Sequence, residues 1–295
     1  MSIKTQPSIR PIDHLVIAVH DLDAARDAYA RLGFTLTPEA RHPFGTANSV
    51  VQLEGGYLEL LAIDDEARIA EPAGDGFSFA AFNRDYLEAR EGLSMLALRS
   101  ADPAGDRADF ARHGLPVYAP FRFERQARAP DGTETDLAFS LTFTGNRQIR
   151  DAGFFTCRNE RPGNFWRPAY QAHANGAARI EAVVMVARDP ADFHEFFFYF
   201  TGQHTMRADS LTVTLDTGGG LIDLVTRVGA RGFYGVEVEP GPSPRFVAMR
   251  IAVPDLAAVR DTLRANGVGH HDLLGRVVVP PDEACGVAVA FSEAP

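Results

Sequence analysis

The chain has 295 residues, enough for two compact domains, and its content of 45% apolar and 23% charged residues is ordinary for a globular protein. The formal net charge of −10 argues against a nucleic-acid partner and against docking on an anionic membrane, since both favour a basic face. The only two cysteines, Cys157 and Cys285, are too few for a disulfide framework, which indicates a reducing compartment.

The first residues, MSIKTQPSIRPIDHL, contain no apolar segment of the kind that a secretory signal peptide requires. The longest aliphatic runs, LVIAV and AVVMVA, have the length of a strand and are too short to span a bilayer. We therefore expect a cytoplasmic protein with no membrane partner.

A strand, a helix and a closing glycine follow one another in residues 12–34, IDHLVIAVHDLDAARDAYARLGF. The alternation in HLVIAV predicts a half-buried strand. Asp21 or Asp23 is suited to cap the helix that follows, and Gly33 stands where a left-handed C-cap belongs. Two further strands, in NSVVQLE and YLELLAI, are separated by a Gly-Gly hairpin signal. The segment therefore reads as a βαβββ module.

The same pattern recurs three more times along the chain, with Gly114, Gly202 and Gly267 closing the helices. Four such units in nearly constant register predict an internal repeat. Residues 158–178 fall outside it and form a predicted link between two halves, which we place at 1–165 and 166–295. The positions that match the first strand lie 19 or 20 residues before each glycine: His14, Ser94, Ala182 and Ala248.

The repeat, with HLVIAV at its start and YLELLAI at its end, resembles the vicinal-oxygen-chelate (VOC) superfamily, which includes glyoxalase I, bleomycin-resistance proteins and extradiol dioxygenases. Within it, the chain looks most like long glyoxalase-like proteins of bacteria. The stretches that carry this likeness are His42-Pro43-Phe44-Gly45-Thr46-Ala47-Asn48, Phe165-Trp166 and Gln171-Ala172-His173-Ala174-Asn175-Gly176-Ala177.

The resemblance implies an α+β fold of four βαβββ modules that form two half-open mixed β-barrels. It also implies a site in a barrel cleft, with ligands from the first and last strands of the modules. His14 and Glu59 stand at these positions in the first module. A divalent ion such as Mn, Fe, Ni or Zn, bound by histidine and carboxylate ligands, is the expected cofactor.

The other modules depart from this pattern, because their matching positions are Ser94, Ala182 and Ala248 on the first strand and Thr156, Asp223 and Ala290 on the last. If the first two modules pair, the cleft offers His14, Glu59, Ser94 and Thr156. A third ligand must then come from outside the register, and His42 and His173 are the candidates; we assign His173 to the metal and His42 to the substrate. Asp223 reads as a remnant of the repeat.

Each of these residues also has a structural interpretation. His14 suits a hydrogen-bonded core histidine, but a carboxylate such as Glu59 is rarely buried without a partner, which favours a shared site. The pair could equally serve as a metal-free general acid and base. Arg125 alternates with Arg122 along FRFERQA and belongs either to a solvated strand face or to an anion clamp, and Trp166 is a candidate substrate contact. Cys157 alternates within an apolar strand and reads as a buried residue rather than a nucleophile.

The chain is therefore expected to be a glyoxalase-like enzyme acting on a small oxygenated molecule, with lyase, isomerase or hydrolase chemistry and His14 and Glu59 as its catalytic residues. One alternative is a protein that binds and sequesters a small molecule without catalysis, and another is an extradiol-type dioxygenase. Convergence of a third ligand on His14 and Glu59 would favour catalysis. A homodimer is also possible, since modules of this superfamily pair across subunits.

Overall fold

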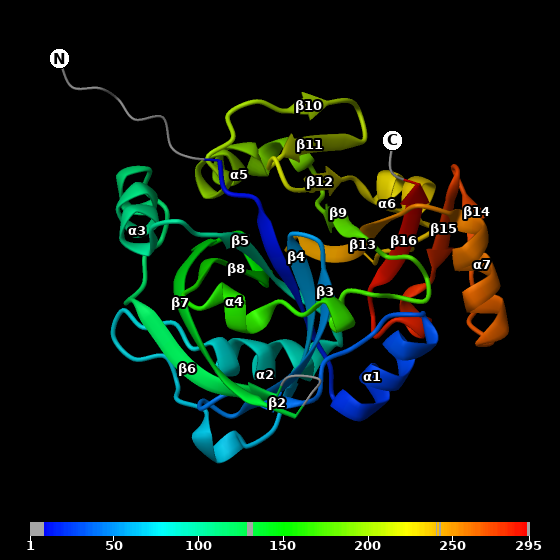
Figure 1. Ribbon diagram of the computed structural model, residues 1–295. Coiled ribbons are helices and arrows are strands. Elements are labelled where there is room, and N and C mark those ends of the chain that lie inside the picture. Colours follow the sequence, from blue (N-terminus) through cyan, green and yellow to red (C-terminus); the bar gives the residue numbers. More distant parts are fainter. Residues whose placement is uncertain (1–8, 129–131, 240, 242, 294–295) are drawn as a thin grey trace.

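The computed structural model describes residues 9–128, 132–239, 241 and 243–293 (Figure 1). Residues 1–8, the start of the N-terminal stretch in which the sequence shows no signal peptide, lie outside the described residues. The architecture is α+β, with two mixed sheets of eight strands each, which confirms the expected fold class of two half-open barrels. None of the helices among the described residues has the length and apolar character needed to cross a bilayer.

The first sheet contains the strands of modules one and two, in the spatial order β2-β3-β4-β1-β5-β8-β7-β6. Within each module the first and last strands pair in parallel, and the two modules meet through an antiparallel pair formed by β1 and β5. Its strands are β1 (Ile12–Ala18), β2 (Ala40–Arg41), β3 (Thr46–Leu53), β4 (Gly56–Ile63), β5 (Gly92–Arg99), β6 (Phe121–Arg128), β7 (Glu134–Asn146) and β8 (Ile149–Asn159).

The second sheet repeats this arrangement with modules three and four, in the order β10-β11-β12-β9-β13-β16-β15-β14. An antiparallel pair of β9 and β13 joins the two modules. Its strands are β9 (Arg179–Val186), β10 (Arg207–Ala208), β11 (Thr212–Asp216), β12 (Leu221–Val225), β13 (Arg245–Val253), β14 (His271–Leu273), β15 (Arg276–Val279) and β16 (Ala288–Glu293).

The first helix of the repeat begins as its sequence predicts, and the predicted glycine follows the end of all four repeat helices. Asp21 caps the first helix, where its carboxylate accepts the Ala24 N–H. All four closing glycines have positive φ, the left-handed conformation that glycine adopts at low cost. The four repeat helices are α1 (Leu22–Arg31), α3 (Pro103–Arg112), α5 (His194–Thr201) and α7 (Leu256–Ala265). The connecting segments add α2 (Phe79–Ala89), α4 (Pro162–Phe165) and α6 (Arg227–Tyr234), with 3-10 turns η1 (Glu66–Arg68), η2 (Pro168–Tyr170), η3 (Pro190–Phe193) and η4 (Pro281–Glu283).

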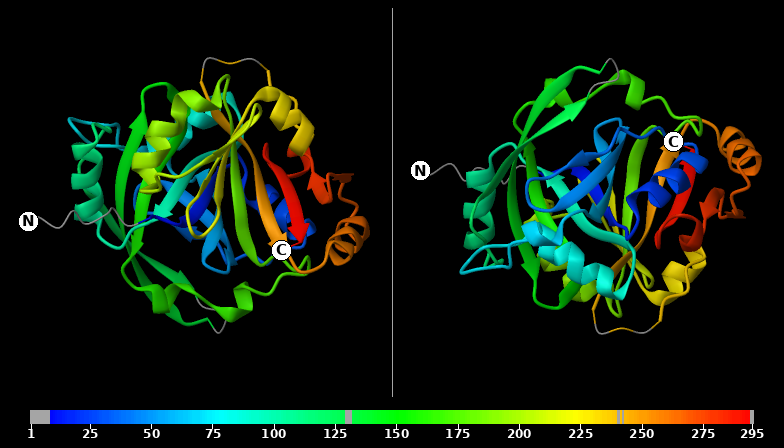
Figure 2. Two further views of the ribbon diagram at one scale, coloured as in Figure 1. Left: turned by 90° about the horizontal axis from the view of Figure 1, so that it is seen from above. Right: turned by 90° about the horizontal axis from the view of Figure 1, so that it is seen from below.

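The two sheets lie side by side and share one hydrophobic core (Figure 2). The largest cluster of buried apolar residues joins side chains of β1, such as Leu15 and Ile17, to side chains of the second sheet, such as Met185 and Ile251. Two smaller clusters fill the insides of the barrels, one around Phe155 and Phe139 and the other around Val184 and Tyr234. Each sheet therefore packs its outer face against its neighbour and turns its inner face to a separate pocket.

Candidate functional site

A narrow pocket lies inside the first barrel, with walls formed by β1, β3, β4, β6, β7 and β8 together with α2 and α4. Six phenylalanines supply much of its apolar wall, and about 30 Å³ of free space remains at its centre. The polar and ionisable side chains that face this space are His14, His42, Asn48, Tyr57, Glu59, Arg125 and Cys157.

His14 enters the pocket from β1, next to an irregularity in the pairing of β1 with β5 between Ile12 and His14. An extra residue of this kind bends a strand and redirects its side chains. Here it brings Asp13 to the same imidazole, so that His14 Nδ1 lies 2.8 Å from Asp13 Oδ2. The ring also stacks on Tyr57 with centroids 4.2 Å apart. The hydrogen bond and the stacking fix the ring and leave Nε2 facing the pocket.

Glu59 enters from β4 and is buried. Its Oε1 accepts a hydrogen bond of 2.5 Å from Asn48 Nδ2. Asn48 lies on the adjacent strand β3, where it pairs with Leu61 of β4. The Asn48 Oδ1 atom has no hydrogen-bond partner among the described residues. A buried amide oxygen without a partner is costly, so it marks a point where a bound molecule would gain a hydrogen bond.

His42 reaches the pocket from the tight turn between β2 and β3. The turn closes through a 2.8 Å hydrogen bond from His42 N–H to the Thr46 carbonyl, and Gly45 adopts a φ of 90° within it. His42 Nδ1 lies 2.8 Å from Thr46 Oγ1, and the ring stacks on Phe44. Burial lowers the pKa of His42 well below its usual value, and the nearby Arg125 guanidinium adds to the effect. The imidazole is therefore neutral at pH 7.

The two imidazoles converge on one carboxylate. His14 Nε2 lies 3.8 Å from Glu59 Oε2, and His42 Nε2 lies 3.8 Å from Glu59 Oε1. In each ring the other nitrogen is held by a neighbouring oxygen, from Asp13 or from Thr46. The structure thus brings together His14, Glu59 and His42, which the sequence placed far apart or in different roles.

Arg125 also belongs to this site. Along β6, Arg122 and Glu124 are exposed and pair with each other, whereas Arg125 turns inward and lines the pocket. Its Nε is buried without a hydrogen-bond partner among the described residues. Burial lowers the pKa of Arg125, and the charges of Glu59 and Tyr57 act against that shift. An inward guanidinium with an unused donor is suited to an anionic oxygen of a ligand.

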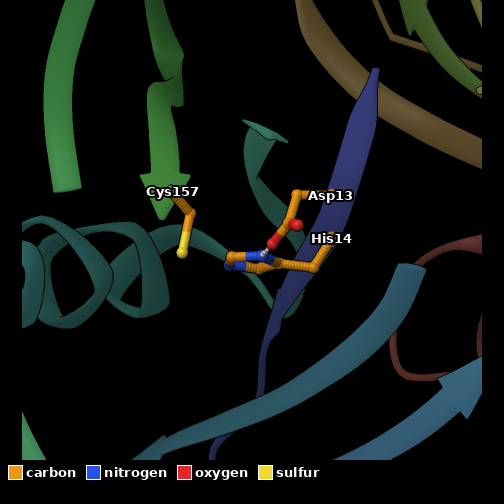
Figure 3. A group of neighbouring side chains, drawn as sticks. All are labelled: Asp13, His14 and Cys157. Atoms are coloured by element: carbon orange, nitrogen blue, oxygen red, sulfur yellow. Dashed lines mark hydrogen bonds and ion pairs between the residues drawn. The ribbon is translucent and has the colours of Figure 1, made fainter. Parts of the chain in front are cut away.

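Cys157 lines the same pocket from β8, and its thiol, the His14 ring and the Asp13 carboxylate place potential ligand atoms within 4.8 Å of one another (Figure 3). Two observations weaken this group as a metal centre. The Asp13–His14 contact is a hydrogen bond, so a proton occupies the space between the two atoms. Burial raises the pKa of Cys157 well above its usual value, which keeps the sulfur as a thiol, and the thiolate is the form that binds metals.

The remaining candidates lie outside this cluster. Trp166 packs behind the wall, with its ring 6.2 Å from that of Tyr57. His173 does not line the pocket, because its Nδ1 accepts the Thr35 N–H and its Nε2 contacts the Gln52 carbonyl. It ties the link between the halves to the first barrel.

Pairing of modules one and two does not bring Ser94 and Thr156 into the cleft. Ser94 donates a hydrogen bond to Asn83 on α2, and Thr156 donates one to Asp106 on α3. On β8 it is Phe155 and Cys157 that face inward. The run FFTCR is apolar on both faces, so its sequence does not reveal which face turns to the pocket.

Asp13, Asn48 and Tyr57 are site residues that the sequence reasoning missed. Asn48 ends the HPFGTAN stretch quoted above, and Tyr57 lies two residues before Glu59 on the same strand face. A period of two could therefore have found Tyr57. Asp13 carries no such signal, because a strict alternation points it away from His14.

Comparison with solved structures shows the same fold at low sequence identity. A hypothetical protein from Staphylococcus aureus superimposes with a TM-score of 0.66 at 11% identity, covering 97% of this chain and 100% of that one. A mutant of 4-hydroxymandelate synthase from Streptomyces coelicolor has a TM-score of 0.61 at 11% identity, covering 97% and 93%. A xylose isomerase-like TIM barrel/4-hydroxyphenylpyruvate dioxygenase fusion protein gives 0.55 at 15% identity, covering 99% of this chain and 51% of that one.

No match was found among curated protein sequences. The model of a glyoxalase-like domain, however, matches residues 12–197, which include the whole first sheet, the link and the first strand of the second sheet. With the two-barrel fold described above, this match shows that the chain belongs to the glyoxalase-like domain family of the vicinal-oxygen-chelate superfamily.

Proposed function

We propose that this protein is an enzyme that acts on a small oxygenated substrate in the pocket of the first barrel, by lyase or isomerase chemistry, with His14, His42 and Glu59 as a divalent metal centre. The observation that carries the proposal is the approach of two imidazole Nε2 atoms to the two different oxygens of Glu59, each at 3.8 Å. In this assignment His42 replaces His173 as the third ligand.

The donor atoms suit a metal in three respects. Two ligand atoms that are each about 2.1 Å from one ion can lie up to about 4.2 Å apart, so a spacing of 3.8 Å admits an ion between Glu59 and either imidazole. Among the described residues, the three are not a group whose ligand atoms all lie within 4.8 Å of one another, so the two imidazoles must move closer for one ion to bind all three. Metal-binding histidines usually engage their other nitrogen with a nearby oxygen, as both do here. A ligating imidazole must also be neutral, and burial holds His42 in that form.

When bound, a divalent ion would supply Lewis-acid polarisation of a substrate oxygen. The protein's own groups do the rest. Asp13 holds His14 in one orientation, and Asn48 holds Glu59. Arg125 lines the same pocket, where its guanidinium would attract negative charge on a substrate oxygen, and the apolar phenylalanine wall would strengthen that attraction. The free space of about 30 Å³ favours a small substrate, or one whose entry moves the wall.

A second candidate function is oxygen-dependent oxidation. Two histidines and one carboxylate with open positions form the ligand set that non-haem iron oxygenases use. His14, His42 and Glu59 have this composition in the first barrel, and one protein of similar fold is a mutant of 4-hydroxymandelate synthase. Under this alternative, iron(II) would be required and substrate turnover would consume dioxygen.

The first test is metal content by plasma mass spectrometry on untagged protein, before and after reconstitution with Mn, Fe, Ni or Zn. We expect near-stoichiometric metal in the wild type and its loss in His14→Ala, His42→Ala and Glu59→Ala. His20→Ala is the matched control, because that side chain is exposed and lies outside the pocket. Loaded protein would then be screened with dicarbonyls, epoxides and catechols, with an oxygen electrode to separate the two candidate functions.

Absence of metal after reconstitution would overturn the metal centre and leave His14 and Glu59 as a metal-free acid and base. Metal that persists in His42→Ala but is lost in His173→Ala would instead reassign the third ligand. We place the enzyme in the cytoplasm, with a small-molecule substrate, no nucleic-acid or membrane partner, and a homodimer as its possible assembly.

A further inference from the structure

A second cavity, of about 360 Å³, lies inside the second barrel. Its position corresponds to the first pocket, because the strand pairings coincide: Tyr57 pairs with His14 in the first barrel, and Leu221 pairs with Ala182 in the second. Two residues further along, Asp223 therefore stands where Glu59 stands, and it lines the second cavity.

In the second barrel, the guanidinium of Arg250 stands in a position comparable to that of the metal proposed for the first barrel. Ala182, the counterpart of His14, pairs with Arg250 on β13, whereas His14 pairs with Ala97 on β5. The Arg250 side chain is buried and reaches Asp223 Oδ2 at 3.3 Å through Nη1 and Glu181 Oε2 at 2.8 Å through Nε. Two carboxylates thus already share one fixed cation, which makes the cavity unsuited to a divalent metal.

Two further arginines line the same cavity with unpaired charges. Within the residues that the structure describes, no ion pair joins Arg276 or the exposed Arg207 to a carboxylate. Arg276 lies over the Tyr234 ring, 5.5 Å from its centroid, and donates only a weak hydrogen bond of 3.5 Å to the Phe233 carbonyl. One opposing charge, Asp209, is partly used, since its Oδ1 accepts the N–H groups of Leu211 and Thr212.

The apolar and aromatic part of the wall is formed by Leu221, Val225, Phe233 and Tyr234, and Thr212 and Thr214 add hydroxyl groups. A cavity of this volume is within the range that binds small organic molecules. We propose that the second barrel is a separate binding site for a small organic anion, with a carboxylate held by Arg207 and Arg276 and an aromatic or aliphatic body against this wall. The metal centre proposed above lies in the first barrel, so this site does not depend on it.

Sodium benzoate is the probe for this site, and benzamide is its uncharged counterpart of similar shape. We expect benzoate binding, measured by isothermal titration calorimetry, to exceed benzamide binding by at least about tenfold, because a hydrogen bond between charged groups contributes about 1.5–3 kcal/mol. Arg276→Leu and Arg207→Leu should each weaken benzoate binding by about tenfold. Arg276→Lys, which keeps the charge, should restore part of it.

Two variants serve as controls. Arg231→Leu removes an arginine from the same helix α6 that carries Phe233, but Arg231 pairs with Glu237 and lies outside the cavity. Arg125→Leu removes the guanidinium of the first pocket. Both should bind benzoate as the wild type does, and thermal melts should show all variants folded. Arg250 is left intact, because its removal would strand two carboxylates.

Failure of benzoate to bind at about 10 mM, well above the millimolar affinity of a weak ligand, would overturn the proposal. Loss of binding in Arg125→Leu with full retention in Arg276→Leu would overturn it as well, because the anion would then occupy the first barrel. Equal binding of benzoate and benzamide would show that charge plays no part.

Discussion

Asp13 fixes the orientation of the His14 imidazole, although it touches the pocket only through that ring. Asp13 Oδ2 contacts His14, and Asp13 Oδ1 lies 3.5 Å from Arg99 Nε, so substitutions can separate the two contacts. Asp13→Ala should lower metal affinity by about 10–100-fold, since loss of a partner that orients a ligand has effects of that size. Competition with a fluorescent chelator measures this affinity.

Arg99→Ala is the matched control for Asp13→Ala, because it removes the other partner of that carboxylate and leaves the contact with His14 in place. It should change metal affinity by less than about twofold, the size of effect expected of an exposed ion pair. If both variants lose metal equally, Asp13 acts through strand stability and not by orienting the ring.

The neutral state of His42 predicts a pH dependence of stability. Burial lowers the pKa of His42 in the native protein, whereas in the unfolded chain it returns to about 6.5. Below that pH the unfolded state binds more protons than the native state, so the free energy of unfolding falls as the pH drops through about 6.5, and it is unaffected well above it.

His42→Gln removes this titration. Urea denaturation at several pH values between about 7.5 and 5 should therefore show a shallower loss of stability in the variant than in the wild type. His173, whose pKa burial also lowers, contributes equally to both proteins and cancels in the comparison. Parallel curves would show that the pKa of His42 is the same in the native and unfolded states, so that burial does not lower it.

Among the elements, the turn between β2 and β3 places His42 and depends on Gly45. A Cβ at this position would collide with the Asp65 carbonyl oxygen, and the φ of 90° is unfavourable for other residues. Gly45→Ala should therefore displace the turn, cost more than about 2 kcal/mol of stability and reduce metal content.

Gly55, in the turn between β3 and β4, is the control for Gly45. Its φ is 72°, but the space around its Cβ position is empty to 4 Å. Gly55→Ala should cost only the backbone term, about 1–2 kcal/mol, and leave metal content unchanged. Equal losses in the two variants would mean that crowding at Asp65 has no influence on the site.

The strands also show how far the sequence could predict this site. The repeat put His14 on the first strand of a module and Glu59 on the last, and the structure has them on β1 and β4, because this order of elements is set by local sequence patterns. It could not place Asp13, because a bulge adds a residue to one strand without a mark in the sequence. The register also predicted that Thr156 of β8 faces the cleft, which is wrong. Its neighbours Phe155 and Cys157 line the pocket, because a shift of one residue moves a side chain to the other face of a strand.

For the whole molecule, a buried ion-pair network ties the two halves together. Arg10 contacts Asp106 at 2.6 Å and Asp109 at 2.9 Å on α3, and it donates hydrogen bonds to the carbonyls of Tyr199 and Phe200 on α5. Arg10→Ala would leave Asp106 buried without a cation and Asp109 with Arg112 alone, and we expect a cost of about 3–5 kcal/mol in denaturant unfolding.

Arg264→Ala removes an exposed ion pair with Asp261 and should cost less than about 1 kcal/mol. If Arg10→Ala costs as little as this control, the halves do not depend on the network.

The shared core between the sheets predicts one cooperative unfolding transition. Residues 1–165 expressed alone should aggregate, because their half of that core would be exposed.

The chain has one tryptophan, Trp166, and it packs against Phe165 and lies 6.2 Å from the Tyr57 ring, which in turn stacks on His14. Its indole is thus coupled through a single aromatic ring to the metal centre proposed for the first barrel. Intrinsic fluorescence excited at the red edge of the absorption band arises from this residue alone. The emission maximum and the quenching of this fluorescence can therefore report binding in the first barrel alone, without a label, although the protein has two barrels.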